Sequence, residues 1–364
     1  QYIHAGAGKL DNDAFVIKFN SNGVRQWGTY YGGNDNDYGI GIFCDGNGNV
    51  FVTGNTSSST GIATSGAHQE TYAGGEDAFV VKFNSNGVRQ WGTYYGGRYL
   101  CKGNGISCDG NGNVYVTGYT ESTTGIATSG SHQETYGDDY DAFVVKFNSA
   151  GVRQWGTYYG GSGWDEGYGI SCDVNGNVFV IGGTQSTNEI ATSGAHQETY
   201  ASHSDAFVVK FNSAGVRQWG TYFGGSAEDE GYGISCDGDG NVFVIGYTIS
   251  TTGIATSGAH QETYAGGTYD VFIAKFSTGA SIIEENVVSS LIIYPNPVTN
   301  ELIIEAKDNH NPINFQIINT IGQVIYNGEL INEIVIPTTN FVSGIYLVKL
   351  ENGKTFEFKK IVKQ

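Results

Sequence analysis

Carboxylates gather in three of the four copies of one short segment, which recurs every 64 residues and differs each time it appears. Each copy follows a Gly-Gly pair, and the copies cover 34–38, 98–102, 162–166 and 226–230. Carboxylate oxygens accept hydrogen bonds, and an aromatic ring beside them offers a stacking surface. Variable loops on a rigid scaffold are where binding residues concentrate. We therefore predict that the ligand-binding residues are Asp37, Trp164, Asp165, Glu166, Asp229 and Glu230.

A catalytic use of these carboxylates has less support. Acid pairs are expected by chance in a chain this acidic, and glycosidase chemistry needs two carboxylates about 5–10 Å apart across a cleft. The sequence contains no Ser/His/Asp nucleophile motif, no His-Glu-x-x-His zinc motif, no phosphate loop and no dinucleotide fingerprint. Drift in weakly constrained loops explains the variable segments equally well. The residues thus favour a non-catalytic protein.

A second recurrent feature is the turn Asp-Gly-Asn-Gly-Asn and its variants, which looks like the start of a calcium loop. Calcium takes six to eight oxygen ligands, and an EF-hand loop closes with a bidentate Glu at its twelfth position. The twelfth position here is a threonine in every copy, beginning with Thr56. Plain hairpin turns are therefore favoured, and calcium stays the alternative at Asp45, Asp109, Asp173 and Asp237.

One His and one Trp also recur in every repeat. His68 and its copies stand in His-Gln-Glu-Thr-Tyr, where His and Glu point to one side of an extended segment. Zinc needs three or four such ligands, so a structural role is favoured. Trp91 and its copies keep a fixed strand position, which is typical of a core aromatic.

Four of the five cysteines occupy the same strand position in different repeats. A disulfide requires Cα atoms within about 7 Å, so we expect no disulfide between them. Cys101 is the exception, because the other repeats have an Asp at its position. We predict that Cys101 is a more exposed thiol than the rest.

Overall composition limits the partners. The 364 residues include 36 acidic and 18 basic side chains, a formal net charge of −18. Nucleic acids and anionic membranes are themselves negative, so neither is expected as a partner. No apolar run approaches the ~20 residues of a membrane helix. The chain starts at Gln1 without a signal peptide, which indicates either a mature start or a fragment.

The 64-residue repeat predicts the fold. Strands are expected in the first unit at 14–19, 25–31, 38–44 and 49–54, because each range is rich in β-branched and aromatic residues. Turns at 20–23 and 45–49 supply residues that tolerate positive φ. Four antiparallel strands per unit are typical of an all-β propeller, with a stacked solenoid as the lesser alternative. Four full repeats and partial ones predict four to five blades, and the recurrent segment 55–76 is expected to be an ordered excursion.

The chain changes composition near its end. All four prolines follow residue 290, whereas nearly all glycines precede it. We place the repeat domain at 1–276, a linker at 277–289 and a C-terminal domain at 290–364. The last domain has short alternating strands, which predict a small immunoglobulin-like β-sandwich.

The repeat resembles a known family. The runs DAFVVKFNSNG, WGTYYGG, GISCDGNGNVYVTGYT and TSGxHQETY are similar to the beta-propeller repeat family called SBBP. The resemblance covers about 13–276 and departs from the family at the His of HQETY. The family name implies seven blades, so the resemblance leaves open that repeats are missing upstream.

The C-terminal domain is similar to the type A sorting domain of the type IX secretion system. The motif residues, in order, are Tyr294, Pro295, Asn296, Pro297, Gly322, Gln323, Gly344, Tyr346, Lys359 and Lys360. The resemblance implies recognition by the type IX machinery of a Gram-negative bacterium and passage through the periplasm. The rest of the chain would then be secreted or held at the outer-membrane surface, with this domain removed. An ordinary immunoglobulin-like binding module is the alternative.

Three classes of function remain. We expect a non-catalytic binding or adhesion module whose ligand is an extracellular glycan or another surface protein. The first alternative is a structural surface-layer or filament component, favoured by near-identical units and low charge density. The second is an extracellular polysaccharide-degrading enzyme, which a unique cluster of acids and His would favour. Fold-level resemblance does not decide among them.

Overall fold

The computed structural model describes residues 11–237, 240–277, 291–306, 313–319, 323–352 and 355–364. The chain divides into two compact units, Gln1–Gly279 and Ala280–Gln364. All regular elements of the described residues are β-strands, and no helix in them is long and apolar enough to cross a membrane. Apart from Ser277, the predicted linker at 277–289 lies outside the described residues.

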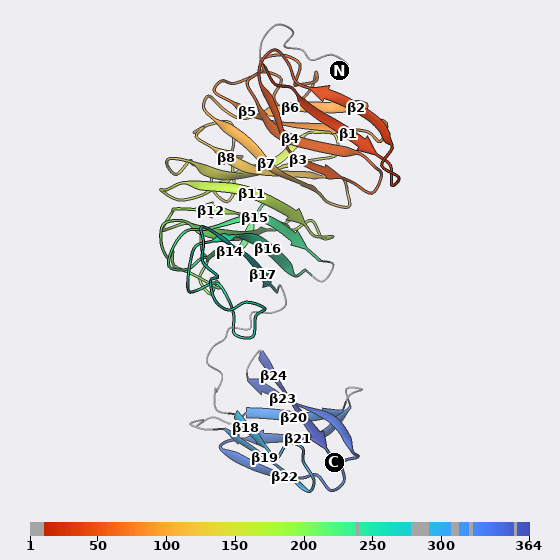
Figure 1. Cartoon of the computed structure of the whole chain (residues 1–364), viewed down its shortest axis with the longest axis vertical. Coiled ribbons are helices and arrows are strands. Elements are labelled where there is room, and N and C mark those ends of the chain that lie inside the picture. Colours follow the sequence, from red (N-terminus) through yellow and green to blue (C-terminus); the bar gives the residue numbers. More distant parts are fainter. Residues whose placement is uncertain (1–10, 238–239, 278–290, 307–312, 320–322, 353–354) are drawn as a thin grey trace. The chain divides into compact units, whose positions relative to one another are not determined.

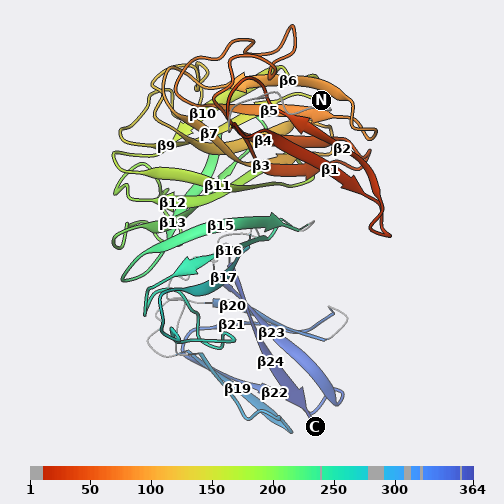
Figure 2. The same ribbon diagram turned by 45° about the horizontal axis from the view of Figure 1, so that its top comes forward.

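The first unit contains five antiparallel sheets that follow one another in chain order, and Figures 1 and 2 show them along an open arc. The first sheet has two strands, β1 (Ala14–Phe19) and β2 (Arg25–Tyr31), and the last has three, β15 (Asp229–Cys236), β16 (Val242–Thr248) and β17 (Asp270–Phe276). The three sheets between them have four strands each: β3 (Asp37–Cys44), β4 (Val50–Thr56), β5 (Asp77–Phe83) and β6 (Arg89–Tyr95); β7 (Cys101–Cys108), β8 (Val114–Thr120), β9 (Asp141–Phe147) and β10 (Arg153–Tyr159); β11 (Asp165–Cys172), β12 (Val178–Thr184), β13 (Asp205–Phe211) and β14 (Arg217–Phe223). The all-β class and the repeated four-stranded blades are confirmed, although the sheets do not close into a ring.

The strand ranges agree with the prediction, but each sheet after the first joins strands from two successive repeats. The 64-residue unit that starts at Asp13 contributes β1-β2 to one sheet and β3-β4 to the next. The reason is the length of the connections. The long segment 57–76 turns back within a sheet, so that Thr56 of β4 lies opposite Asp77 of β5. The short segment after the Gly-Gly pair instead crosses to the following sheet.

The segment 57–76 is an ordered excursion, as predicted. Ile62 is fully buried under the sheet. The backbone N–H of Thr64 donates to the carbonyl of Gly92 at 2.9 Å, and the N–H of Gln69 donates to Oγ1 of Thr93 at 2.9 Å. These bonds attach the excursion to the fourth strand of its own sheet.

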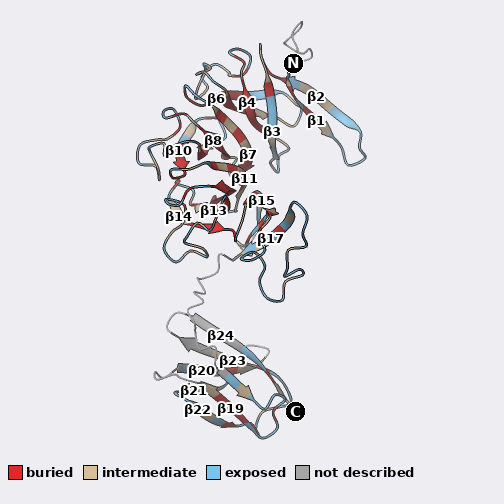
Figure 3. Ribbon diagram, turned by 60° about the vertical axis from the view of Figure 1, so that its left-hand side comes forward, coloured by how far each residue is buried: buried red, intermediate tan, exposed pale blue. Residues whose placement is uncertain are grey.

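The core lies between neighbouring sheets, and Figure 3 shows in red that the buried residues are concentrated on the inner strands. Trp91 is 8% exposed and packs against Phe147 of the following sheet, and its indole N–H donates to the carbonyl of Ser149 at 3.1 Å. The ring of His68 lies 6.1 Å from that of Tyr95 and 5.8 Å from that of Phe147. Burial lowers the pKa of His68 to about 4. The structural roles predicted for the recurrent Trp and His are confirmed.

The prediction for Cys101 is wrong. Its side chain is fully buried, and this burial raises the pKa of the thiol to about 12. The Asp that other repeats carry at this position is buried as well, so the exchange keeps the residue inside the sheet junction. Cys44 is the exposed thiol, and all five cysteines are free.

The second unit is a β-sandwich of two sheets. One sheet has the order β18 (Leu291–Tyr294), β19 (Glu301–Ala306) and β22 (Glu333–Pro337), and the other has β21 (Val324–Leu330), β20 (Ile313–Asn319), β23 (Gly344–Asn352) and β24 (Thr355–Lys363). Buried residues of both sheets form one core, with Leu302 and Ile304 packed in the same cluster as Phe315 and Val348. The fourth strand pairs with the third, whereas in a constant-type immunoglobulin domain it joins the first sheet. The immunoglobulin-like arrangement is therefore not confirmed.

Candidate functional site

The six predicted ligand-binding residues fall into two groups. Asp37, Asp165 and Asp229 begin equivalent strands and are at most 1% exposed. The serine two residues after each following strand donates to the carboxylate, as Ser186 does to Asp165 Oδ2 at 2.6 Å. The backbone N–H of Gly161 donates to the same oxygen at 2.8 Å. Burial raises the pKa of Asp165 to about 6.

The three buried aspartates therefore stabilise the scaffold. Thr184 donates to the second oxygen of Asp165, so the chain's own groups occupy both carboxylate oxygens. Equivalent bonds from serine and backbone N–H hold Asp37 and Asp229. All three carboxyl groups are buried, which does not favour the role in ligand binding predicted for Asp37, Asp165 and Asp229.

The other three predicted residues lie around one cavity of about 420 Å³. Trp164 precedes β11, Glu166 is the second residue of β11, and Glu230 is the second residue of β15. The cavity thus lies where the edge strands of two neighbouring sheets begin. Its lining is completed by Tyr168, Gly183, Gln185, His203, Ser204 and Glu228.

The two aromatic residues that line this cavity, Tyr168 and Trp164, each pack against further aromatic rings outside the lining. Tyr168 and Tyr232 are stacked with ring centroids 4.8 Å apart, and Tyr232 is followed by Tyr247 at 5.7 Å. On the other side, the ring of Trp164 meets that of Tyr140 edge to face at 5.3 Å. Trp164 is nevertheless 50% exposed, so half of its surface remains open to solvent.

The carboxylates of the cavity are oriented by tyrosine hydroxyls. Tyr168 donates to Glu166, Tyr232 donates to Glu230 at 2.9 Å, and Tyr247 donates to Glu228. Burial raises the pKa of Glu230, and the neighbouring Glu228 raises it further. Burial together with the bond to Glu230 raises the pKa of Tyr232 to about 12. The site combines fixed hydrogen-bond acceptors with one exposed indole.

The six predicted residues leave out several lining residues, among them Tyr168, His203 and Glu228, although Glu228 and His203 stand in variable segments of the repeat. A signal was present for the first of them. Tyr168 and its copy Tyr232 stand where the earlier repeats have Ile40 and Asn104, so the position changes type along the chain. This change marks the two repeats whose strands border the cavity.

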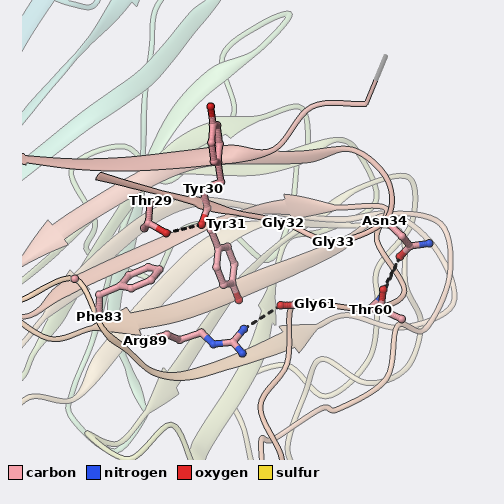
Figure 4. Close-up of a pocket in the computed structure, with 11 residues that line it drawn as sticks. Thr29, Tyr30, Tyr31, Gly32, Gly33, Asn34, Thr60, Gly61, Phe83 and Arg89 are labelled. Carbon is pink, nitrogen blue, oxygen red and sulfur yellow. Dashed lines mark hydrogen bonds between the residues drawn. The ribbon is translucent and has the colours of Figure 1, made fainter. Parts of the chain in front are cut away.

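A second cavity, of about 550 Å³, lies beside β2 and is drawn in Figure 4. Its lining includes Tyr31, Phe83 and Arg89, and Arg89 donates to the carbonyl of Gly61 at 2.9 Å. One repeat later, the equivalent Tyr95 and Phe147 hold the ring of His68 between them. This cavity therefore corresponds to a packing position of the repeat, which makes it the weaker candidate for ligand binding.

The turns considered for calcium are held by their own aspartates. Asp173 Oδ1 accepts the backbone N–H of Asn175 at 2.9 Å and that of Asn177 at 2.8 Å, and Oδ2 accepts the Asn177 amide at 2.6 Å. The described parts of the turns at Asp45, Asp109 and Asp237 show the same bonding. Among the described residues there is no group of three or more His, Cys, Asp or Glu side chains that could hold a metal ion.

The predicted sorting residues lie on several strands of the second unit. Asn296 joins the segment after β18 to β24, because its amide donates to the carbonyl of Lys360 at 3.0 Å and its Oδ1 accepts the N–H of Val362 at 2.9 Å. Tyr346 is buried and donates to the carbonyl of Val342 at 2.7 Å. The remaining residues comprise Tyr294 at the end of β18, Pro295 and Pro297 beyond it, Gln323 before β21, Gly344 at the start of β23, exposed Lys359 and Lys360 on β24, and Gly322, which lies outside the described residues.

Family comparisons agree with this architecture. Residues 292–364 match the family model of the secretion system C-terminal sorting domain. Residues 26–61, 90–125 and 218–254 match the model of the SBBP beta-propeller repeat. Both resemblances inferred from the sequence are confirmed. The matches identify beta-propeller repeats in the first unit and a secretion sorting domain in the second. The sorting domain indicates export by the type IX system to the cell surface or the extracellular space and implies recognition by that machinery.

Individual relatives add little to this class. An uncharacterized WD repeat-containing protein, L264 of Acanthamoeba polyphaga mimivirus, is 24% identical over 200 residues, which are 47% of this chain. The chain spans only 14% of that protein's length. Among solved structures, the extracellular domain of the hybrid two component system BT3049 from B. thetaiotaomicron matches with a TM-score of 0.31 and 12% identity, covering 100% of this chain and 46% of that one. A TM-score this low supports no conclusion about fold or function.

Proposed function

We propose that the first unit is an extracellular binding module for carbohydrate, and that its ligand site is the cavity lined by Trp164, Glu166, Glu228 and Glu230. The observation that carries the proposal is the pairing of a half-exposed indole with three oriented carboxylates around one cavity. The sorting domain supports it, because export brings this cavity into contact with the cell surface and its surroundings.

The chemistry of the cavity suits a sugar. A pyranose ring presents C–H groups on its faces, which pack against an aromatic ring, and hydroxyls at its rim. The carboxylates are acceptors for those hydroxyls, and the tyrosines that already donate to them hold them in place. Cavities of this size with a few convergent polar groups are typical ligand sites. We propose no catalytic step at this site.

The test is a glycan-array screen of the full chain, followed by affinity measurements on any hit. We expect Trp164→Ala to weaken binding by about tenfold or more, equivalent to about 1.4 kcal/mol, because the stacking surface is lost. Glu228→Gln should weaken it as well, since a charged acceptor becomes neutral. Tyr99→Ala is the matched control, because Tyr99 is an exposed aromatic in the equivalent loop of the preceding repeat.

Two outcomes would contradict the proposal. A blank array would argue against a carbohydrate ligand and leave a protein ligand as the next candidate. Binding that Trp164→Ala does not alter would show that a carbohydrate site exists elsewhere on the chain.

A further inference from the structure

The first unit ends in two apolar faces that no described segment covers. The leading face consists of Phe15, Ile17 and Phe19 on β1 with Ile40 and Ile42 on β3, all exposed. The trailing face consists of Phe243 and Ile245 on β16 with Val271 and Ile273 on β17, also exposed. Figures 1 and 2 place these strands at opposite ends of the arc of sheets.

The same positions are buried wherever a neighbouring sheet packs against that face. Phe15 is 70% exposed, whereas its copies in the inner sheets, Phe79, Phe143 and Phe207, are fully buried. Ile273 is 76% exposed, whereas its copies Val80, Val144 and Val208 are fully buried. Each face therefore keeps side chains that are core residues one repeat away. Contiguous apolar surface of this kind marks an interaction site.

Inside the chain, trailing positions of one sheet always pack against leading positions of the next. At the junction of the second and third sheets, Val80 shares a core cluster with Phe143 and Val145. At the junction of the third and fourth sheets, Val144 shares one with Phe207 and Val209. The two kinds of face are complementary to each other, because this one contact recurs along the chain.

Lysines on trailing faces donate hydrogen bonds to the next sheet, so the contact has a defined direction. Lys82 and Lys146 stand on trailing faces, and their ammonium groups donate to the carbonyls of Ser149 and Ser213 in the next sheet at 3.3 and 2.9 Å. Both lysines also lie over an aromatic ring of their own sheet, at 5.3 and 5.2 Å from its centroid. Lys275 keeps this geometry on the last sheet, 5.4 Å from the ring centroid of Phe243.

We propose that the trailing face of one copy binds the leading face of a second copy, so that chains associate head to tail. The contact continues the sheet-to-sheet packing of the first unit, with Val271 and Ile273 against Phe15, Ile17 and Phe19. Lys275 then donates to the carbonyl of Ser21 in the second copy, the counterpart of Ser85, Ser149 and Ser213. The contact is heterologous, since the two surfaces differ, and it leaves one free face on each outer copy.

The test is sedimentation velocity of the full chain from micromolar to several hundred micromolar concentration. We expect a mass above that of one 38.9-kDa chain that rises with concentration. Ile17→Asp blocks the leading face and Ile273→Asp blocks the trailing face, so each variant alone should associate at least tenfold more weakly. An equimolar mixture should restore association but stop at two chains, because only one intact face of each kind meets its complement. Val216→Asp, at an exposed turn position, is the control and should associate as the unaltered chain does.

Two results would overturn the proposal. A single-chain mass at every concentration would exclude association with a second copy. Dimers formed by either variant on its own would show that like faces pair. Circular dichroism checks that both variants fold. If either does not, Phe15→Ser and Val271→Ser, each at a position 70% exposed, repeat the mixing experiment.

Discussion

Asp141 and Asp165 approach the same glycine from two neighbouring sheets. A Cβ placed on Gly160 would lie 2.5 Å from Oδ1 of Asp141 and 2.6 Å from Oδ2 of Asp165. Equivalent carboxyl pairs surround Gly32 and Gly224 at two other junctions. The first glycine of these three Gly-Gly pairs is therefore required by the two carboxyl groups that fill the space beside its α-carbon, whereas at Gly96 one carboxyl group, that of Asp77, and Cys101 fill it.

Gly160→Ala should destabilise the first unit by about 1–3 kcal/mol, the usual cost of an added methyl group in a filled site. Asp165 cannot move away easily, because Gly161, Ser186 and Thr184 all donate to it. The measurement is urea unfolding followed by circular dichroism. Gly110→Ala is the control, since no atom lies within 4 Å of its added Cβ, and it should stay within about 0.5 kcal/mol of the unaltered chain. Equal losses in the two variants would contradict this account.

The buried aspartates predict that stability falls as pH rises. Burial raises the pKa of Asp141 to about 7 and that of Asp77 to about 7, from an ordinary value of 3.8. Between these values the folded chain holds protons that the unfolded chain has released, so the free energy of unfolding decreases with increasing pH. The stabilisation is complete below about pH 4 and is lost as pH passes through 7. We expect a lower melting temperature at pH 8 than at pH 5.

Asp141→Asn isolates the contribution of one carboxyl group. Oδ2 of Asp141 accepts the N–H of Gly137 at 2.8 Å and the amide of Gln133 at 3.0 Å, whereas its buried Oδ1 has no hydrogen-bond partner. An asparagine keeps the accepting oxygen and is neutral at every pH. The variant should therefore melt at a higher temperature than the unaltered chain at pH 8, with a shallower pH dependence. Asp139→Asn, at an exposed site, should leave the slope unchanged. Stability that rises with pH would refute the prediction.

Much of the fold could be predicted from local sequence. Turn residues at 20–23 and 45–49 fix the hairpins, and the strand ranges follow from the apolar runs between them. The grouping into sheets could not be predicted the same way. It depends on whether the long segment 57–76 or the short one after Gly33 crosses between sheets, and strand pairing across such connections is decided by tertiary packing.

Only part of the candidate site could be predicted, because its residues come from two neighbouring sheets. Asp165 and Glu166 are adjacent in one strand, so they point to opposite faces, and only one of them reaches the cavity. The recurrence of Asp at this position, as at Asp37, indicates a role for Asp165 that the repeats share. The stacking of Tyr168 on Tyr232 joins residues of two sheets, and it follows only once the order of sheets is known.

The final prediction concerns the Asp-Gly-Asn-Gly turns. The hydrogen bonds within the turn occupy both carboxylate oxygens of Asp173, so we expect EDTA to leave the melting temperature unchanged. Asp173→Ala should cost about 1 kcal/mol, the usual net value of such hydrogen bonds, whereas Asp173→Asn keeps an accepting oxygen and should cost less. Differential scanning calorimetry with and without chelator measures both effects. A fall in melting temperature with EDTA that added calcium reverses would instead show that these turns bind calcium, and Asp173→Asn would then reduce the response to calcium.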